Sequence, residues 1–569
     1  MNFSKYEGPQ DLSQLAPSDL PHFCQDLRNY LIEEILQQGG HFAANLGVVE
    51  LCVALMVKFP VEHHRFIWDV GHQSYPYKIL TKRKKQIQNI RSFEGISGFP
   101  KINESPYDSF GTGHSSTAIS AAMGMAWAQK SLSPKLQHTV VCIVGDGALT
   151  GGMSFEALNN IKSSQLDILI VYNDNGMGID PNAGAIHLAN EKELKHWFEF
   201  FGLHYTGPVD GHNTDALLSA MDLCQTQPGP KLLHVKTIKG KGFEAAELEQ
   251  TKWHSAPKYV KVQPNTSKTR AWHEAFGSLV YELANLNKDI MGITPAMPSS
   301  SGLSKCIKEF PERFIDVTIA EQHALTFAAG IAQSGKRPVV AIYSTFLQRA
   351  YDQLIHDIAL QNLPVVICID RAGLVGEDGP THHGAFDLAF LLPIPNLHIY
   401  APATETELRI SLEQALESKN PICIRYPKGP IPEISGIGSG SLDWVIQNNQ
   451  NNILCISTGK TSEFLGEIRE RLEPLKVNWL HICQIKPLPI INNLDSYKYI
   501  VTVEDGIVTG GMGQFLEQNY QAQTSAKWIH LGIKDEFIPH GSNKILYELA
   551  GYGPESIFNE LSDLTSRLS

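Results

Sequence analysis

Two short polar segments each follow a strongly apolar stretch, and together they could bind a metal-bound diphosphate. Residues 145–147 (GDG) come after VVCIV, and residues 173–175 (NDN) come after LDILIVY. Glycines let backbone N–H groups approach an anion where a helix begins. If the two stretches are neighbouring parallel strands, Asp146 and Asn175 meet at their carboxyl ends. A carboxylate and an amide oxygen suit Mg²⁺, which takes few protein ligands beside phosphate oxygens.

Each segment alone also has a simpler interpretation, because short motifs match by chance. GDG is then a tight turn and NDN an ordinary loop, and only their order at the ends of consecutive strands favours a binding site. Two other segments are interpreted as turns. STGKTS (457–462) has Leu454 where a P-loop needs its first glycine, and GGMGQF (510–515) lacks the dinucleotide-binding spacing.

The elements that must position these residues are apolar, β-branched runs alternating with helical patterns. Continuous apolar runs are typical of parallel strands covered on both faces, and repeated strand–helix–strand units imply right-handed crossovers. The pattern predicts an α/β fold with mainly parallel sheets. Strands are expected at 138–145, 166–173, 231–237, 337–344, 364–370, 452–457 and 499–504, and helices at 154–163 and 321–334.

The length of 569 residues predicts three or four domains at about 150 residues each. Two segments have the composition of linkers: residues 255–270 are polar and without periodicity, and residues 426–441 are rich in Pro, Gly and Ser. They divide the chain into three predicted domains, 1–265, 270–430 and 440–569.

The composition excludes several classes of protein. Hydrophobic residues make up 43% and charged residues 19%, which argues against disorder. The net charge of −12, without a basic block, predicts no nucleic-acid partner. No apolar run approaches the ~18 residues of a membrane span, and the start lacks the pattern of a signal or transit peptide. Nine scattered cysteines without a CxxC pair predict buried thiols in a reducing, cytoplasmic compartment.

GDG followed by NDN resembles the cofactor motif of the transketolase-like thiamine diphosphate enzymes. Further segments narrow this to a resemblance with the 1-deoxy-D-xylulose-5-phosphate synthase family. They run in order through all three predicted domains and include DVGHQ (69–73), GTGHSS (111–116), GPVDGH (207–212), DVTIAEQHA (316–324), IDRAG (369–373), GPTHHGAFD (379–387), IRYPKG (424–429) and EDGIVTGGMG (504–513).

The resemblance implies a fold, a reaction and partners. The three domains become a diphosphate- and Mg²⁺-binding domain, a pyrimidine-binding domain and a C-terminal transketolase-like domain. The reaction is that of a transferase: pyruvate loses CO₂ and condenses with D-glyceraldehyde 3-phosphate to give 1-deoxy-D-xylulose 5-phosphate, a precursor of isoprenoids, thiamine and pyridoxal. Thiamine diphosphate and Mg²⁺ are the implied cofactors, and the enzyme is expected to be a cytoplasmic homodimer.

The resemblance also implies site residues, position by position. They are Glu321, His41, His254 and His382 for catalysis; His72, Gly113, His114, Ser115, Gly147, Ala148, Asn175, Phe243 and Glu321 for the cofactor; Asp146, Asn175 and the Met177 carbonyl for Mg²⁺; and Tyr343, Arg349, Arg371, Asp378 and Arg425 for the substrates. Glu321 would hydrogen-bond the aminopyrimidine ring and shift its tautomer.

Taken without the resemblance, these residues have ordinary interpretations. Glu321 is then an acid stabilised by the helix dipole, each arginine belongs to a surface ion pair, and the histidines are structural. Two other functions remain open: a transketolase, and a regulatory protein that binds the cofactor without catalysis. The segment between NDN and GPVDGH is shorter than the family pattern, as in a natural short variant or an engineered deletion.

Overall fold

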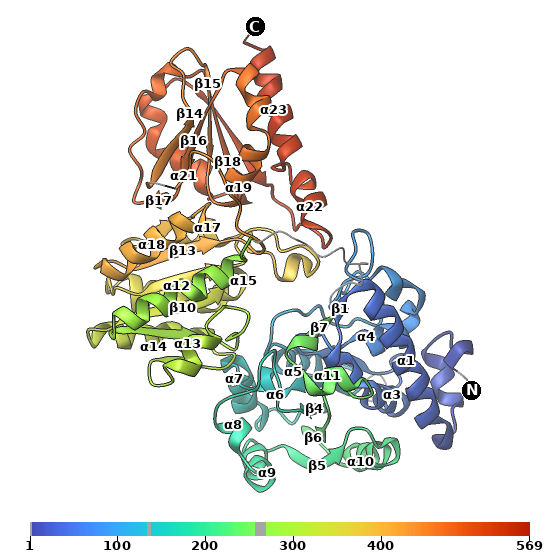
Figure 1. The fold of residues 1–569 in the computed structure, drawn as a ribbon. Coiled ribbons are helices and arrows are strands. Elements are labelled where there is room, and N and C mark those ends of the chain that lie inside the picture. The colour runs from blue at the N-terminus through green and yellow to red at the C-terminus, as the bar shows by residue number, and fades with distance from the viewer. Residues whose placement is uncertain (1–2, 134–137, 257–268, 439, 569) are drawn as a thin grey trace. The chain divides into compact units, whose positions relative to one another are not determined.

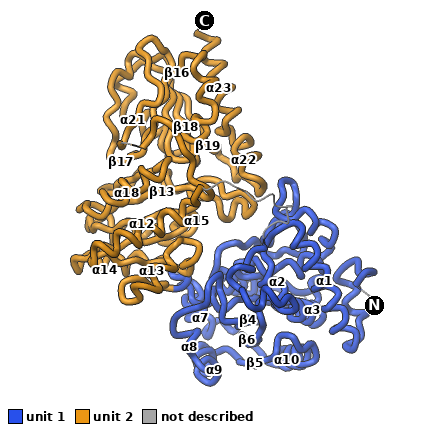
Figure 2. Tube along the Cα trace, viewed as in Figure 1, with its two compact units in different colours: residues 1–265, 318–320 blue, residues 266–317, 321–569 orange. Residues whose placement is uncertain are grey.

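The computed structural model describes residues 3–133, 138–256, 269–438 and 440–568 (Figure 1). The chain forms two units, one of residues 1–265 and 318–320 and one of residues 266–317 and 321–569 (Figure 2). Of the expected linkers, residues 257–268 of the first and residue 439 of the second lie outside the described part. The division into three domains stays a prediction.

The first unit contains a five-stranded sheet in which every neighbouring pair is parallel. The strand order is β2–β3–β4–β6–β5, with β2 at Arg65–Trp68, β3 at Val140–Gly145, β4 at Ile168–Asp174, β5 at His204–Asp210 and β6 at Lys231–Lys236. Gly145 lies opposite Asn173 in the register of β3 and β4. GDG and NDN therefore leave the sheet at the same edge.

Both faces of this sheet are covered by helices, as continuous apolar strands require. Val141 and Ile143 of β3 belong to one core cluster, whereas Val140, Cys142 and Val144 belong to another. The first cluster draws on α1 (Leu20–Gln38), α3 (Val49–Lys58) and α10 (Thr214–Thr226), and the second on α5 (Ala118–Gln129), α7 (Gly152–Ile161) and α9 (Glu191–Phe200). A separate two-stranded sheet pairs β1 (Gly40–His41) with β7 (Ser255–Ala256).

The second unit contains two further sheets. The seven-stranded sheet has the order β17–β12–β13–β11–β10–β8–β9, and only β17 runs antiparallel to its neighbour. Its strands are β8 (Ile290–Thr294), β9 (Phe314–Asp316), β10 (Arg337–Tyr343), β11 (Val366–Asp370), β12 (His398–Tyr400), β13 (Ile422–Tyr426) and β17 (Gln484–Lys486). Helices beside it include α12 (Trp272–Leu286), α14 (Glu321–Gln333), α17 (Asp387–Leu391) and α18 (Glu405–Glu417).

The five-stranded sheet of this unit has the order β14–β16–β15–β18–β19, and only β14 is antiparallel. Its strands are β14 (Leu442–Ile446), β15 (Ile453–Ser457), β16 (Val477–Ile482), β18 (Tyr499–Ile507) and β19 (Lys527–Ile533), with α19 (Lys460–Glu467), α21 (Met512–Tyr520) and α23 (Pro554–Ser566) beside them.

The α/β class with mainly parallel sheets is confirmed, and each of the seven expected strands overlaps an observed one. The expected helices correspond to α7 and α14. All nine cysteines are buried and unpaired, as predicted. Among the described helices, none combines the length and the apolarity that a membrane span requires.

Candidate active site

Asp146 is the centre of the polar edge formed by β3 and β4. It begins the short helix α6 (Asp146–Leu149), and burial raises the pKa of its carboxyl. Oδ2 accepts the backbone N–H groups of Asn175 at 2.9 Å and Gly176 at 2.5 Å, and Oδ1 accepts that of Gly147 at 2.8 Å. The N–H of Gly147, expected to face a diphosphate, is thus already bonded to Asp146.

The other expected metal ligands lie in the loop after β4. Oδ1 of Asn175 accepts the backbone N–H of Met177 at 3.0 Å, which folds the loop back toward Asp146. Among the described residues, no three His, Cys, Asp or Glu side chains gather as a metal site. A cation here would therefore rely on one carboxylate together with amide and carbonyl oxygens, a set that fits Mg²⁺.

Lys239 is a positively charged group at this edge that the sequence reasoning missed. It is 2% exposed, and Nζ donates to the Gly178 carbonyl at 2.6 Å. Burial lowers the pKa of Lys239 to about 8, and the nearby carboxylates of Asp146 and Asp180 act in the opposite direction. Its position in the glycine-rich segment KGKG (239–242) was the available signal, because such segments approach phosphates.

The GTGHSS segment is fixed against α6 through Ser116. The backbone N–H of Ser116 donates to Oδ1 of Asp69 at 2.7 Å, and its Oγ donates to the Ala148 carbonyl at 2.7 Å. Ser116 has a φ of 69°, which is uncommon for a residue other than glycine. Gly113, His114 and Ser115, expected to contact the cofactor, are therefore held close to GDG by the next residue in the chain.

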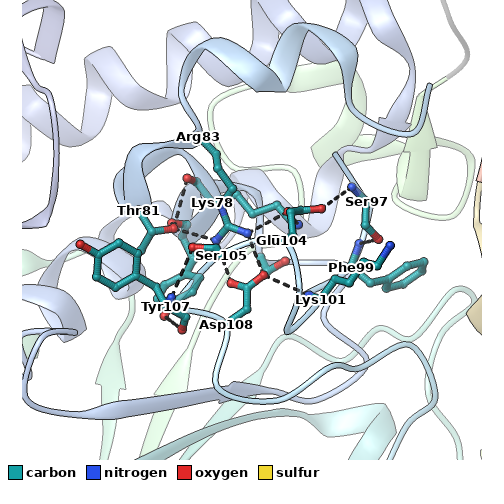
Figure 3. A network of polar contacts seen from close by, with 12 residues as sticks. Lys78, Thr81, Arg83, Ser97, Phe99, Lys101, Glu104, Ser105, Tyr107 and Asp108 are labelled. Carbon is teal, nitrogen blue, oxygen red and sulfur yellow. Dashed lines mark hydrogen bonds and ion pairs between the residues drawn. The ribbon is translucent and has the colours of Figure 1, made fainter. Parts of the chain in front are cut away.

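A buried ionic network anchors the loop that leads into this segment (Figure 3). Arg83 donates to both oxygens of Asp108, at 2.7 and 2.8 Å, and to Glu104 at 2.8 Å. Glu104 also pairs with the fully buried Lys78 and accepts the backbone N–H of Ser97 at 2.6 Å. Because both carboxylates are paired and hydrogen-bonded, the network fixes the loop without leaving a charge uncompensated.

Three of the expected histidines lie together in the first unit. The ring centroids of His41, His72 and His254 are 5.3–5.8 Å apart. The short β1–β7 pairing brings His41 and His254 to this place, and the Tyr75 hydroxyl lies 3.2 Å from Nδ1 of His41. Phe243 packs edge-on against Phe42, with centroids 5.3 Å apart.

Glu321 begins α14 in the second unit, as expected, and is buried. Burial raises the pKa of its carboxyl, against the opposing effect of Arg349, whose Nη1 lies 3.4 Å from Oε2. The net effect shifts Glu321 toward its neutral form relative to an exposed glutamate, as suits a group that exchanges a proton.

Two of the predicted substrate residues, Arg371 and Tyr343, are linked to the predicted catalytic His382 by a chain of ring contacts. The guanidinium of Arg371 lies 4.1 Å from the centroid of the Tyr343 ring, which stacks on Phe346 at 5.6 Å. Phe346 in turn contacts the ring of His382 at 5.6 Å, and Thr381 Oγ1 lies 2.9 Å from Nδ1 of His382. The Thr381 hydroxyl donates to the Asp378 carbonyl at 3.2 Å, which places that residue beside the chain.

Arg425 differs from the expectation that it faces a substrate phosphate. Its side chain is 1% exposed. Nε donates to Asp387 at 3.0 Å, and Nη1 donates to Asp505 at 2.6 Å. The second carboxylate lies 80 residues away in β18, so the sequence carried no local signal for this pairing. In this structure Arg425 neutralises buried acids rather than presenting its charge at an open pocket.

Comparison with protein-family models matches three stretches of the chain. Residues 3–196 and 189–237 match the model described as 1-deoxy-D-xylulose-5-phosphate synthase. Residues 268–433 match the transketolase pyrimidine-binding domain, and residues 442–557 match the transketolase C-terminal domain. The first match is split within the segment between Asn175 and GPVDGH that is short in this sequence.

Curated relatives match along nearly their whole length. The 1-deoxy-D-xylulose-5-phosphate synthases of Cytophaga hutchinsonii and Carboxydothermus hydrogenoformans are each 40% identical, over 98% of this chain and 97% and 98% of their own. That of Chromobacterium violaceum is 41% identical over 95% of this chain and 96% of its own. The chain belongs to the 1-deoxy-D-xylulose-5-phosphate synthase family.

Proposed function

We propose that this chain is a thiamine diphosphate-dependent transferase that condenses pyruvate with D-glyceraldehyde 3-phosphate. CO₂ is released, and 1-deoxy-D-xylulose 5-phosphate is formed. The observation that carries the proposal is the full-length match to synthases of that name, with the predicted site residues present. The product would feed isoprenoid, thiamine and pyridoxal synthesis.

The residues around Asp146 fit Mg²⁺ and a diphosphate. The backbone N–H groups that donate to the Asp146 carboxylate are neutral, so they leave its negative charge available to a cation. Asp146, Asn175 and the Met177 carbonyl would hold Mg²⁺ with the hard oxygen ligands that it prefers. Lys239 adds a positive charge for the diphosphate, and Gly113, His114, Ser115, Gly147, Ala148 and Phe243 would complete the binding surface.

When bound, thiamine diphosphate supplies the C2 carbanion and the electron sink. Glu321 would hold a proton at its carboxyl and share it with the aminopyrimidine end, a role that its raised pKa supports. His41, His254 and His382 would orient substrate oxygens and move protons, and His72 would contact the cofactor. The Tyr75 hydroxyl and the Thr381 hydroxyl, respectively, fix the rings of His41 and His382.

The acceptor phosphate is assigned to Arg371, with Tyr343, Arg349 and Asp378 lining the substrate pocket. The Arg371 guanidinium stacks on Tyr343, and its Nη1 donates to Asp370 and to the Ser300 carbonyl at 3.2 Å, so a phosphate would bind at its other N–H groups. Arg425 has two carboxylates to neutralise and is left out of this role. A homodimer in the cytoplasm, without a nucleic-acid partner, is part of the proposal.

One experiment tests the reaction directly. Purified protein is incubated with Mg²⁺, thiamine diphosphate, pyruvate and D-glyceraldehyde 3-phosphate, and the product is identified by NMR. The expected product is 1-deoxy-D-xylulose 5-phosphate, with ¹⁴CO₂ released from [1-¹⁴C]pyruvate in the presence of the aldehyde. A two-carbon transfer between sugar phosphates, without use of pyruvate, would identify a transketolase instead.

A further inference from the structure

The loop of residues 237–243 presents two candidate cofactor residues, Lys239 and Phe243. It follows β6 and is tied to the rest of the unit by a few hydrogen bonds. Oγ1 of Thr237 donates to the Asn173 side chain at 2.6 Å, and the N–H of Gly240 donates to the Ala43 carbonyl at 2.8 Å. Between these two bonds, the loop has a third attachment at Ile238.

That attachment is His212, the last residue of the GPVDGH segment, for which the proposed reaction has no use. Its Nε2 accepts the backbone N–H of Ile238 at 2.9 Å. A ring nitrogen that accepts carries no proton, so the proton of the neutral ring is on Nδ1. Nδ1 lies 3.1 Å from Oε2 of Glu50 and donates to it. The ring is therefore oriented by the carboxylate on one side and holds the loop on the other.

Glu50 is itself fixed by a buried partner. Nη2 of Arg28 donates to both carboxylate oxygens, at 2.5 and 2.6 Å, and both residues are buried. Burial raises the pKa of Glu50, but the hydrogen bonds from His212 and Arg28 hold it below its ordinary value overall. The Arg28 side chain also lies against the far end of the loop, because a Cβ built on Gly242 would be 2.5 Å from Arg28 Cδ.

We infer that His212 is a positioning residue whose imidazole, oriented by the Arg28–Glu50 pair, fixes the 237–243 loop for cofactor binding. The chain Arg28–Glu50–His212–Ile238 connects α1, α3, the loop after β5 and the loop after β6. His212 does not touch the reacting atoms in this role. The structural part of the inference is independent of the proposed function, whereas its effect on the cofactor rests on that function.

Two variants of His212 each keep one of the two hydrogen bonds of the imidazole and remove the other. In His212→Gln the amide oxygen can reach the place of Nε2 and still accept from Ile238. In His212→Asn the shorter amide can replace Nδ1 toward Glu50 but leaves the Ile238 N–H without its acceptor. A matched control is His530→Asn, because the His530 ring also has a polar partner on each nitrogen, the Thr502 hydroxyl and the Glu517 carboxylate, each at 2.8 Å.

The first measurement is amide hydrogen exchange at Ile238 in the protein without cofactor. One lost hydrogen bond is expected to speed this exchange about 3- to 10-fold in His212→Asn, while His212→Gln and His530→Asn stay near the parent protein. Unchanged exchange in His212→Asn, or equal acceleration in His212→Gln, overturns the inference. This readout does not depend on any catalytic activity.

The second measurement is calorimetric titration of thiamine diphosphate with Mg²⁺ present. The dissociation constant should rise about 3- to 10-fold in His212→Asn and recover in His212→Gln, while kcat at saturating cofactor stays near that of the parent. A fall in kcat without a change in affinity contradicts a positioning role. If the parent protein itself does not bind thiamine diphosphate, the proposed function fails while the exchange result still stands.

Discussion

Buried carboxylates have different hydrogen-bond donors in two regions of the molecule. At the β3–β4 edge of the first unit the donors are neutral, whereas around β13 and β18 of the second unit the donor is an arginine. Asp146 receives three backbone N–H groups and no arginine. Asp387 and Asp505 share the guanidinium of Arg425, and Asp387 also accepts from the Ser344 hydroxyl at 3.1 Å. Burial raises the pKa of both Asp146 and Asp387, so both carry a desolvation cost.

The difference lies in what offsets that cost. Neutral donors orient a carboxylate but leave its negative charge available to a cation that binds. An arginine compensates that charge inside the folded protein. Glu321 lies between these cases, because Arg349 is near but only loosely bonded at 3.4 Å. The partner of each buried acid thus indicates whether that acid serves binding, folding or proton transfer. Four substitutions test this assignment.

The largest effect is expected at Glu321. Glu321→Ala should lower turnover about 10²–10⁴-fold at saturating cofactor, because a general acid–base group is lost. Binding of the diphosphate end, measured by calorimetry, should change little. Near-normal turnover would show that Glu321, like Asp387 and Asp505, serves the fold and not proton transfer.

Arg425→Ala should act on stability. Removing one partner of a buried pair costs about 3–5 kcal/mol, which corresponds to a fall in Tm of roughly 10 °C. The control is Arg409→Ala, whose pair with Glu282 is exposed and is worth about 0–1 kcal/mol. An unchanged Tm together with a raised KM for glyceraldehyde 3-phosphate would return Arg425 to the substrate site.

Asp146→Asn should act on binding. Loss of a ligand is expected to weaken thiamine diphosphate binding with Mg²⁺ by at least about 100-fold, the upper end of what groups behind the ligands contribute. Thermal stability should fall less than in Arg425→Ala, because the amide oxygen can keep the bonds from Asn175 and Gly176 and only the bond from Gly147 is lost. Asp222→Asn, at an exposed pair with Lys58, controls for the change of residue type. Equal affinity in both variants would make GDG a structural turn.

The smallest effect is expected at Arg371. Arg371→Ala should raise KM for glyceraldehyde 3-phosphate about 10- to 100-fold, since a charged hydrogen bond is worth about 1.5–3 kcal/mol. KM for unphosphorylated D-glyceraldehyde should stay within a few-fold. Equal losses for the two aldehydes would show that Arg371 supports Tyr343 and the fold instead.

The pattern of apolar residues along the sequence predicted strands whose side chains are buried along nearly their whole length. β3 and β4 were predictable because they are continuous apolar runs. β5 and β14 were not, because nearly all of their residues are exposed or half buried and their apolar periodicity is weak. The shared edge of GDG and NDN followed from parallel pairing alone.

Contacts between distant segments escaped prediction. Arg425 meets Asp505, and His212 meets Glu50 across 162 residues, so neither pairing leaves a trace in the neighbouring sequence. Nothing in the sequence distinguished Lys239 from Lys241, because both lie in the glycine-rich segment KGKG (239–242). The resemblance supplied the positions of Arg371 and Arg425 but not their carboxylate partners, which are Asp370 for the first and Asp387 and Asp505 for the second.

The tight contact of Ser116 with Gly151, the residue before α7, also limits how this part of the sequence can change. A Cβ on Gly151 would lie 2.1 Å from Oγ and 2.9 Å from Cβ of Ser116, but 3.2 Å from the Ile319 carbonyl. Alanine at 151 therefore requires glycine at 116, which also suits the φ of 69°. A glycine at 116 has no hydroxyl to donate to the Ala148 carbonyl, so it is not expected without a change at 151. Positions 116 and 151 are therefore expected to change together or not at all.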